Sequence, residues 1–147
     1  MGLSYSLKRP DKWPADFKLY PEHGPTGLNG WRVFVAWEAD GVSPVRDAYL
    51  DLDPRDRAGF QKSYETLASN NGRVRNKEHF KKLEGTDLYE FKRFQLRLAG
   101  FFLPGKIFVI CHIPKPKKRD GWRDQDIERA KTTKNRFESM VAPKKGR

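Results

Sequence analysis

The strongest pattern of apolar positions lies between residues 88 and 113, where three short segments have the composition of β-strands. They are LYEFKRF, QLRLAGFF and KIFVICHI, and short turns separate them. Leu103-Pro104-Gly105-Lys106 predicts a tight turn, because proline presets the backbone and glycine accepts a positive φ. The segment 106–113 is almost entirely apolar after its first residue, which is typical of a strand buried on both faces. The pattern therefore predicts three consecutive strands.

Two segments earlier in the chain predict a further strand and a helix. WRVFVAWE, at residues 31–38, has strand composition. Asp53-Pro54 predicts a helix start, since aspartate can cap free amides and proline suits the first helical position. Phe60, Tyr64 and Leu67 then share one helical face, and Asn-Asn-Gly at residues 70–72 predicts the helix end.

Two more helices are expected, one before and one after the three strands. Residues 77–83 predict a short helix that buries Phe80 and Leu83. A final helix is expected from Asp124, a candidate cap, with acidic residues in its first turn where they are favoured. Its inward-facing stripe is predicted to consist of Ile127, Ala130, Lys134, Phe137 and Val141.

This order of elements predicts the α+β class, with residues 31–141 as a single domain. Residues 1–30 are rich in proline and glycine and predict an irregular N-terminal arm, and residues 142–147 predict a basic tail. The residues expected to pin the arm onto the domain are Trp13, Phe17, Leu19 and Tyr20. We expect a small twisted, largely antiparallel sheet packed against two or three helices, with two helices on one face.

Composition narrows the classes of protein to which the chain can belong. Its 147 residues fit one domain, and ten Phe, five Tyr and four Trp argue against full disorder. No apolar run approaches the roughly 18 residues of a membrane helix, and no signal-peptide pattern opens the chain. The only cysteine, Cys111, lies in the most apolar strand, so we expect a structural thiol and neither an internal disulfide nor a thiolate zinc site. These features favour a cytoplasmic protein that does not contact a membrane.

The net charge of +11 is distributed unevenly along the chain. Residues 1–71 hold 9 Lys or Arg against 10 Asp or Glu, whereas residues 72–147 hold 21 against 9. A chain that is basic in one half presents an electrostatic face. Nucleic acid is the commonest partner of such a face, ahead of acidic proteins and anionic membranes.

Several local patterns, in the order in which they occur, resemble the HigB-like, phage-derived branch of the RelE/ParE toxin superfamily. They are VFVAWEADGVSPVRDAYLDL, a strand and glycine turn followed by Pro-Val into a helix; KKLEGTDLYEFKRF; LRLAGFF, an arginine-bearing strand; IFVICHIPKPKKR, a closing strand with a Lys-Lys run; and DIERAKTTKNRFES, a last helix. The resemblance covers about residues 31–140.

The resemblance implies a type II toxin that enters the ribosomal A site and cleaves messenger RNA. Its partners would be mRNA, the ribosome with its rRNA, and a small helix-turn-helix antitoxin. The implied fold is a compact α+β domain with helices packed against a twisted sheet. Two positions depart from the family pattern: Lys92 stands where the family has arginine, and Trp122 is the nearest aromatic residue to a place where some relatives have tyrosine.

Cleavage of RNA without a metal requires the 2′-hydroxyl to attack its own phosphate. The site must remove that proton, balance the added charge and protonate the leaving oxygen. No acidic pair or histidine cluster suggests a metal centre, and we expect no cofactor. The candidate catalytic residues are Lys92, Arg97, Lys117, Lys118 and Arg119. The candidate RNA-binding residues are Lys81, Lys82, Arg93, Lys115 and Trp122.

Structural roles stay open for several of these residues. Arg97 could pair with Glu90 on the neighbouring strand, and the basic run at residues 115–119 could be a solvated loop. Trp122 could anchor the last helix instead of stacking on a base. His112, in an apolar strand, is more typical of a core histidine. A functional alternative is a non-catalytic toxin of the same fold that acts on a protein such as a topoisomerase.

Overall fold

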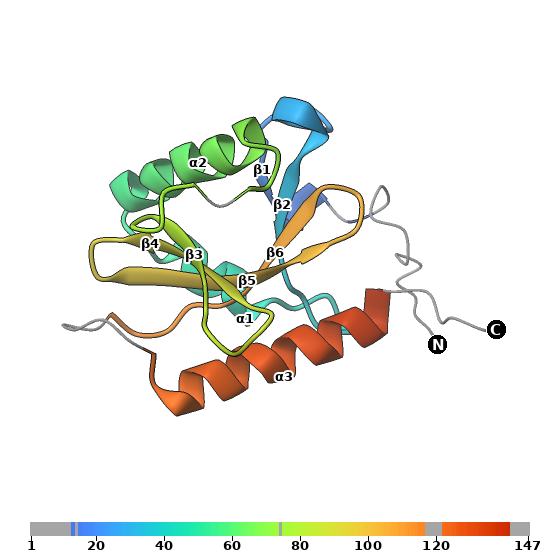
Figure 1. Ribbon diagram of the computed structural model, residues 1–147. Helices are drawn as coiled ribbons and strands as arrows, with labels where there is room; N and C mark the ends of the chain where they lie inside the picture. Colours follow the sequence, from blue (N-terminus) through green and yellow to red (C-terminus); the bar gives the residue numbers. More distant parts are fainter. Residues whose placement is uncertain (1–12, 14, 74, 117–121, 142–147) are drawn as a thin grey trace.

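The structure is a computed structural model that describes residues 13, 15–73, 75–116 and 122–141 (Figure 1). The helices are α1 (Pro44–Leu50), α2 (Pro54–Ser69) and α3 (Asp124–Val141), with two 3₁₀ helices, η2 (Ala15–Phe17) and η3 (Leu28–Gly30). The strands are β1 (Lys18–Tyr20), β2 (Arg32–Val35), β3 (Phe80–Lys82), β4 (Tyr89–Arg93), β5 (Leu96–Leu103) and β6 (Ile107–His112). The α+β class is confirmed.

The six strands form one mixed sheet in the order β1-β2-β6-β5-β4-β3. β2 and β6 are parallel, and the other neighbouring pairs are antiparallel. The three strands predicted between residues 88 and 113 are confirmed as β4, β5 and β6, and β6 is buried on both faces as its composition predicts. Gly105 has a φ of 91° in the β5–β6 turn, which explains the glycine there.

The two long helices lie on opposite faces of the sheet, so the two helices predicted from residues 53 and 124 do not share a face (Figure 1). The face of α2 does carry two helices, because Tyr49 of α1 joins the same apolar cluster. On one face, Phe60, Tyr64 and Leu67 of α2 pack against Phe91 and Phe108 of the sheet. On the other face, Phe137 and Val141 of α3 pack against a second cluster. Each face of the sheet is apolar enough to need its own cover, and one long helix per face supplies most of it.

The helix predicted over residues 77–83 is also wrong, because Phe80–Lys82 forms the edge strand β3. Phe80 and Leu83 are buried as expected, and their spacing of three residues does not distinguish the two structures. The carbonyl of Asn76 accepts hydrogen bonds from the amides of His79 and Phe80, which makes a turn before the strand. Pairing with β4 then supplies backbone hydrogen bonds that so short a helix would lack.

Of the three α-helices, α2 begins as the sequence predicts, and α1 and α3 differ from the expectation. Asp53 caps α2 by accepting a hydrogen bond from the amide of Arg55, as predicted. Helix α1 was not predicted from the apolar pattern, although the family resemblance placed a helix after Pro44-Val45; the Ser43 hydroxyl caps it. Asp124 is the first residue of α3 and not its cap, because the amides of Asp126 and Ile127 donate to the carbonyl of Arg123.

Residues 15–30 contain more regular structure than the irregular arm that the sequence predicts. β1 pairs with β2 at the edge of the sheet, and Tyr20 is buried beside it. Trp13 is also buried, and its ring lies edge-on to Phe34, with 4.5 Å between the ring centroids. The aromatic residues therefore pin this segment to the domain as predicted, and the strand forms because β2 offers an open edge. Residues 1–12 lie outside the described part of the chain.

Candidate nucleic-acid site

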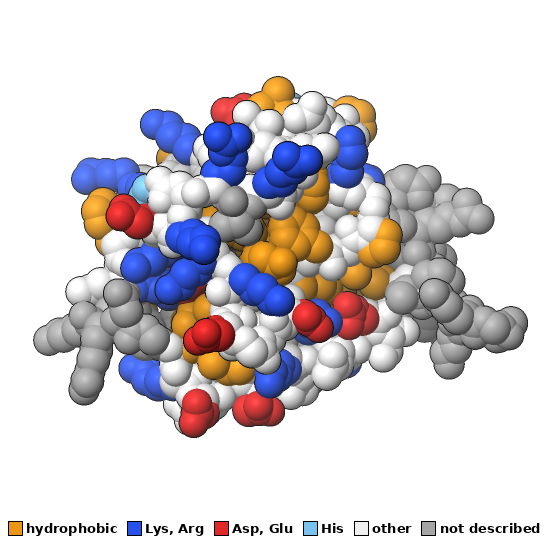
Figure 2. All heavy atoms as spheres, viewed as in Figure 1, with side chains coloured by type: hydrophobic (Ala, Val, Ile, Leu, Met, Phe, Trp, Pro, Cys, Tyr) orange, Lys and Arg blue, Asp and Glu red, His pale blue; other side chains and the backbone are white. Residues whose placement is uncertain are grey.

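Lys and Arg side chains gather over α2 and over the β3–β4 part of the sheet on the face drawn in Figure 2. Strand register explains part of this gathering. Lys81 of β3 lies opposite Glu90 of β4, and Lys92 of β4 lies opposite Arg97 of β5. Side chains alternate along a strand, so Glu90 and Lys92 project from the same face. That is the α3 face, because Ala99, opposite Glu90, belongs to the apolar cluster of α3.

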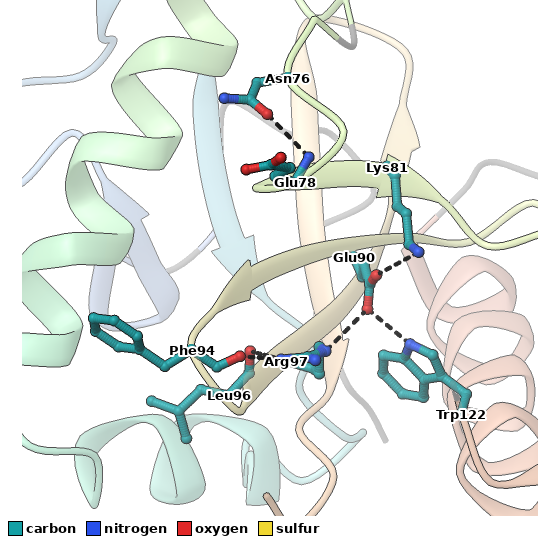
Figure 3. Close-up of polar contacts among 8 residues, drawn as sticks. All are labelled: Asn76, Glu78, Lys81, Glu90, Phe94, Leu96, Arg97 and Trp122. Carbon is teal, nitrogen blue, oxygen red and sulfur yellow. Dashed lines mark hydrogen bonds and ion pairs between the residues drawn. The ribbon is translucent and has the colours of Figure 1, made fainter. Parts of the chain in front are cut away.

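Glu90 is the centre of this group, and we call Glu90, Lys81, Arg97 and Trp122 the Glu90 cluster (Figure 3). Lys81 Nζ lies 3.6 Å from Glu90 Oε2, and Arg97 Nε lies 3.6 Å from Oε1. The Trp122 indole Nε1 donates to Oε1 at 2.8 Å. One carboxylate on β4 thus contacts side chains from β3, from β5 and from the segment that leads into α3.

Burial determines what each member of the Glu90 cluster can do. Glu90 is 2% exposed and Arg97 is 6% exposed, whereas the Lys81 side chain is 44% exposed. A buried charge is tolerated only when it is paired and hydrogen-bonded. Arg97 also donates to the carbonyls of Phe94 at 2.7 Å and Leu96 at 3.0 Å. The alternative in which Arg97 pairs with Glu90 is therefore confirmed, and the guanidinium is held inside the protein.

The Trp122 side chain is partly buried and makes structural contacts. Its indole nitrogen donates to Glu90, and its ring packs against the apolar cluster beneath α3. Of the two roles left open by the sequence, the anchoring of the last helix is the one that these contacts favour. Sequence reasoning considered Glu90 only as a partner for Arg97 and missed its contacts with Lys81 and Trp122.

Apart from Lys92, the other candidate site residues among the described residues lie away from the Glu90 cluster. Arg93 is on the opposite face, where its Nε lies 3.1 Å from Asp56 Oδ1 of α2. Lys82 is exposed and lines a shallow depression with Lys131 and Lys134 of α3. Lys115 is exposed after β6. The remaining predicted catalytic residues, Lys117, Lys118 and Arg119, lie outside the described residues.

His112 and Asp126 form a second polar pair on the α3 face, at the end of β6. His112 Nε2 donates to Asp126 Oδ1 at 2.9 Å, and Arg123 Nη1 lies 3.5 Å from Oδ2. Burial opposes ionisation of Asp126, but the hydrogen bond and charge of His112, with Arg123, outweigh it and lower the pKa below the ordinary 3.8. His112 therefore has a polar partner at the edge of the core, and the pair ties α3 to β6.

We expect this pair to make stability depend on acid pH. A carboxyl with a lowered folded-state pKa contributes stability above its ordinary value, and this contribution is lost as the pH falls through the folded-state value. Asp126→Asn should therefore be less stable than wild type at neutral pH, and the gap should narrow below pH 3.8. Urea unfolding at several pH values measures the gap. Asp124→Asn, at an exposed position of the same turn, is the control, and an Asp126→Asn gap that does not change with pH would contradict the assignment.

Neither a reactive thiol nor a metal site is found in the described part of the chain. Burial raises the pKa of Cys111 to about 12, which makes the thiol unreactive at neutral pH. No group of three or more His, Cys, Asp or Glu residues there could hold a metal ion.

No protein-family model matches the chain, and no curated protein matches it either. Among the helices of the described residues, none combines the length and the apolar character required to cross a bilayer.

Proposed function

We propose that this chain is a type II toxin of the RelE/ParE superfamily, in its HigB-like branch, and that it cleaves messenger RNA on the ribosome. The proposal starts from the family resemblance of residues 31–140. It is supported by the α+β fold and by the cross-strand placement of Lys81, Lys92 and Arg97. That placement, in which register brings cations of three neighbouring strands to one place around a buried glutamate, is the observation that carries it.

In the proposed reaction, the 2′-hydroxyl of a nucleotide attacks the adjacent phosphate, and a phosphorane with added negative charge forms. Lys92, which is partly exposed, and Lys81, which is held by Glu90, are assigned to stabilise that charge. Lys117, Lys118 and Arg119, which follow β6 in sequence, are assigned to proton transfer and phosphate contact. The products would be a 2′,3′-cyclic phosphate and a 5′-hydroxyl.

The assignment of Arg97 changes from phosphate contact to positioning. Its guanidinium is bonded to Glu90 and to two carbonyls and is 6% exposed, so a phosphate could reach it only after a rearrangement. Arg97 and Glu90 would instead fix the position of Lys81 beside the reacting phosphate. The proposal includes a cytoplasmic location, the ribosome as the place of action and a helix-turn-helix antitoxin as the controlling partner, with no cofactor.

A non-catalytic toxin or binding module of the same fold, acting on a protein such as a topoisomerase, is the second candidate. The burial of Arg97 favours it, because one of the expected phosphate ligands is already occupied by protein groups.

Primer extension on messenger RNA from cells that express the protein tests the proposed function. We expect growth arrest together with new RNA ends inside translated codons. Expression of Lys81→Ala/Lys92→Ala provides the comparison, and it should leave the same transcripts intact. Growth arrest by the wild type with intact transcripts would reject the ribonuclease and favour the second candidate.

A further inference from the structure

A groove of about 910 Å³ runs between α2 and the β3–β4 edge, on the opposite face of the sheet from the Glu90 cluster. We call it the α2 groove. The charged and aromatic residues that line it are Arg55, Lys62, Arg73, Arg75, Glu78, His79, Phe80, Lys92, Arg93 and Phe94. Small polar residues of α2, Ser63 and Thr66, form part of its wall.

The α2 groove has a strong excess of positive charge. Arg55, Lys62, Arg73 and Arg75 are exposed, and none of them forms an ion pair with a described residue. Glu78 is the only acidic residue among the described residues that line the groove. Blue side chains lie over α2 and over the neighbouring sheet edge in Figure 2. Cations that face one another across a groove repel each other, so the arrangement favours an anionic occupant.

Near its start, helix α2 makes room for a cation of the groove. Gly59 lies beneath the Arg93 guanidinium, and a Cβ at this position would lie 2.3 Å from Arg93 Cζ. The absence of a side chain therefore lets Arg93 cross the helix and reach Asp56. Arg55 and Lys62 are seven residues apart, which places them on the same side of the helix, two turns apart. A row of cations with small residues between them is the result.

Phe94, at the tip of the β4–β5 hairpin, is the most unusual residue of the groove. It is 78% exposed and has a φ of 55°, a backbone region that a bulky residue seldom adopts. The Arg93 Cζ atom lies 5.0 Å from the centre of its ring. The ring thus contacts the Arg93 guanidinium, and most of it stays open to solvent. An exposed aromatic ring beside cations is an arrangement on which a nucleic-acid base can stack.

We propose that the α2 groove binds a stretch of single-stranded RNA, with a base stacked on Phe94 and phosphates contacted by Arg55, Lys62, Arg73 and Arg75. A π-face next to a row of cations is the combination used to bind single strands, because every base has a face to stack and every linkage has a charge. An acidic peptide would satisfy the cations but would leave the ring uncovered. This site goes beyond the proposed function, because it does not depend on cleavage or on the ribosome. Lys92 borders the groove, although alternation along β4 directs its side chain to the Glu90 face, so the groove and the proposed reaction site meet at this strand.

Fluorescence anisotropy with a labelled oligouridylate of about ten nucleotides tests the groove on the purified protein. Phe94→Ala should weaken binding by about 5- to 100-fold, as expected for the loss of one stacked base. Phe94→Tyr should retain binding. Leu50→Ala, which truncates another exposed apolar residue, is the matched control and should bind like the wild type.

Salt dependence tests the cations separately. Arg73→Ala/Arg75→Ala should reduce the slope of log Kd against log salt by about 1.4, whereas Arg129→Ala/Lys131→Ala on α3 should leave it unchanged. Equal effects of the two double variants, or of Phe94→Ala and Leu50→Ala, would overturn the proposal. Displacement of the RNA by polyglutamate at equal charge would also overturn it and favour an acidic protein as the occupant. Absence of cleavage does not affect these measurements, so they can fail or succeed independently of the proposed function.

Discussion

Replacement of Glu90 by alanine is expected to lower the free energy of unfolding by about 3–5 kcal/mol, because it leaves the Arg97 guanidinium buried without its carboxylate. It also removes the acceptor of the Trp122 indole and the partner of Lys81. Urea unfolding followed by tryptophan fluorescence measures the change. Glu84→Ala, at an exposed position between β3 and β4, is the matched control and should change stability by less than about 0.5 kcal/mol.

Replacement of both buried charges separates the cost of an orphaned charge from the value of the pair. Glu90→Leu/Arg97→Met should regain most of the stability lost in Glu90→Ala, because apolar groups of similar volume often replace a buried ion pair at little cost. If Glu90→Ala were as stable as Glu84→Ala, the Glu90 cluster would not be the centre of the site. If the double variant were less stable than Glu90→Ala, the buried pair would stabilise the fold by more than the neutralisation of one charge by the other.

Replacement of Lys92 by alanine is expected to slow mRNA cleavage by about 10²- to 10³-fold, which is typical of the loss of one group that stabilises charge in a transition state. The side chain is partly exposed and lies opposite Arg97, so its truncation leaves no cavity in the core. The rate of cleavage in single-turnover reactions on programmed ribosomes measures the effect. Thermal unfolding should show that the Lys92→Ala protein is folded.

Lys92→Arg provides the conservative comparison. Arginine has the same charge and offers a planar pair of donors to phosphate oxygens, so this variant should retain cleavage. Lys115→Ala, which removes another exposed cation, should have a smaller effect than Lys92→Ala. Wild-type rates for Lys92→Ala would remove this residue from the reaction site, and a loss of the folded state would assign it a structural role.

The fold could be predicted where a local pattern has one structural solution. The three strands between residues 88 and 113 and helix α2 were predicted because their apolar periodicity and end signals agree. Strand β3 was not predicted, since three residues with one buried aromatic fit a strand or a helix equally well, and only pairing with β4 decides between them. The placement of α2 and α3 on opposite faces depends on the path of the chain through the sheet, which local sequence patterns do not predict.

The candidate site was predictable in part for a similar reason. A glutamate and an arginine on adjacent strands can be proposed as partners from the sequence, and the Glu90–Arg97 pair is found. The contacts of Glu90 with Lys81 and Trp122 depend on strand register and on the chain before α3, which the sequence does not reveal. The local pattern even points the other way, because alternation along the strand places Glu90 on the face opposite Tyr89 and Phe91, where a carboxylate is expected to meet solvent.

The α2 groove was not predicted, because its cations are far apart in sequence. Arg55 and Lys62 lie in the half of the chain that has almost no net charge, so the uneven distribution of charge does not predict that they join a basic surface. Arg73, Arg75 and Phe94 reach the same groove from two other segments. The exposed ring of Phe94 is apparent only when the hairpin turn is placed, since an aromatic residue in a segment of strand composition is usually buried.

Cleavage of mRNA by the purified protein on ribosomes carrying a defined codon in the A site tests the central claim most directly, with the wild type and Lys81→Ala/Lys92→Ala compared in single-turnover reactions. The account predicts that the wild type cuts within that codon and leaves a 2′,3′-cyclic phosphate, and that the double variant stays folded and bound to the ribosome without cutting. Intact mRNA with the wild type, or equal rates for the two proteins, would contradict it.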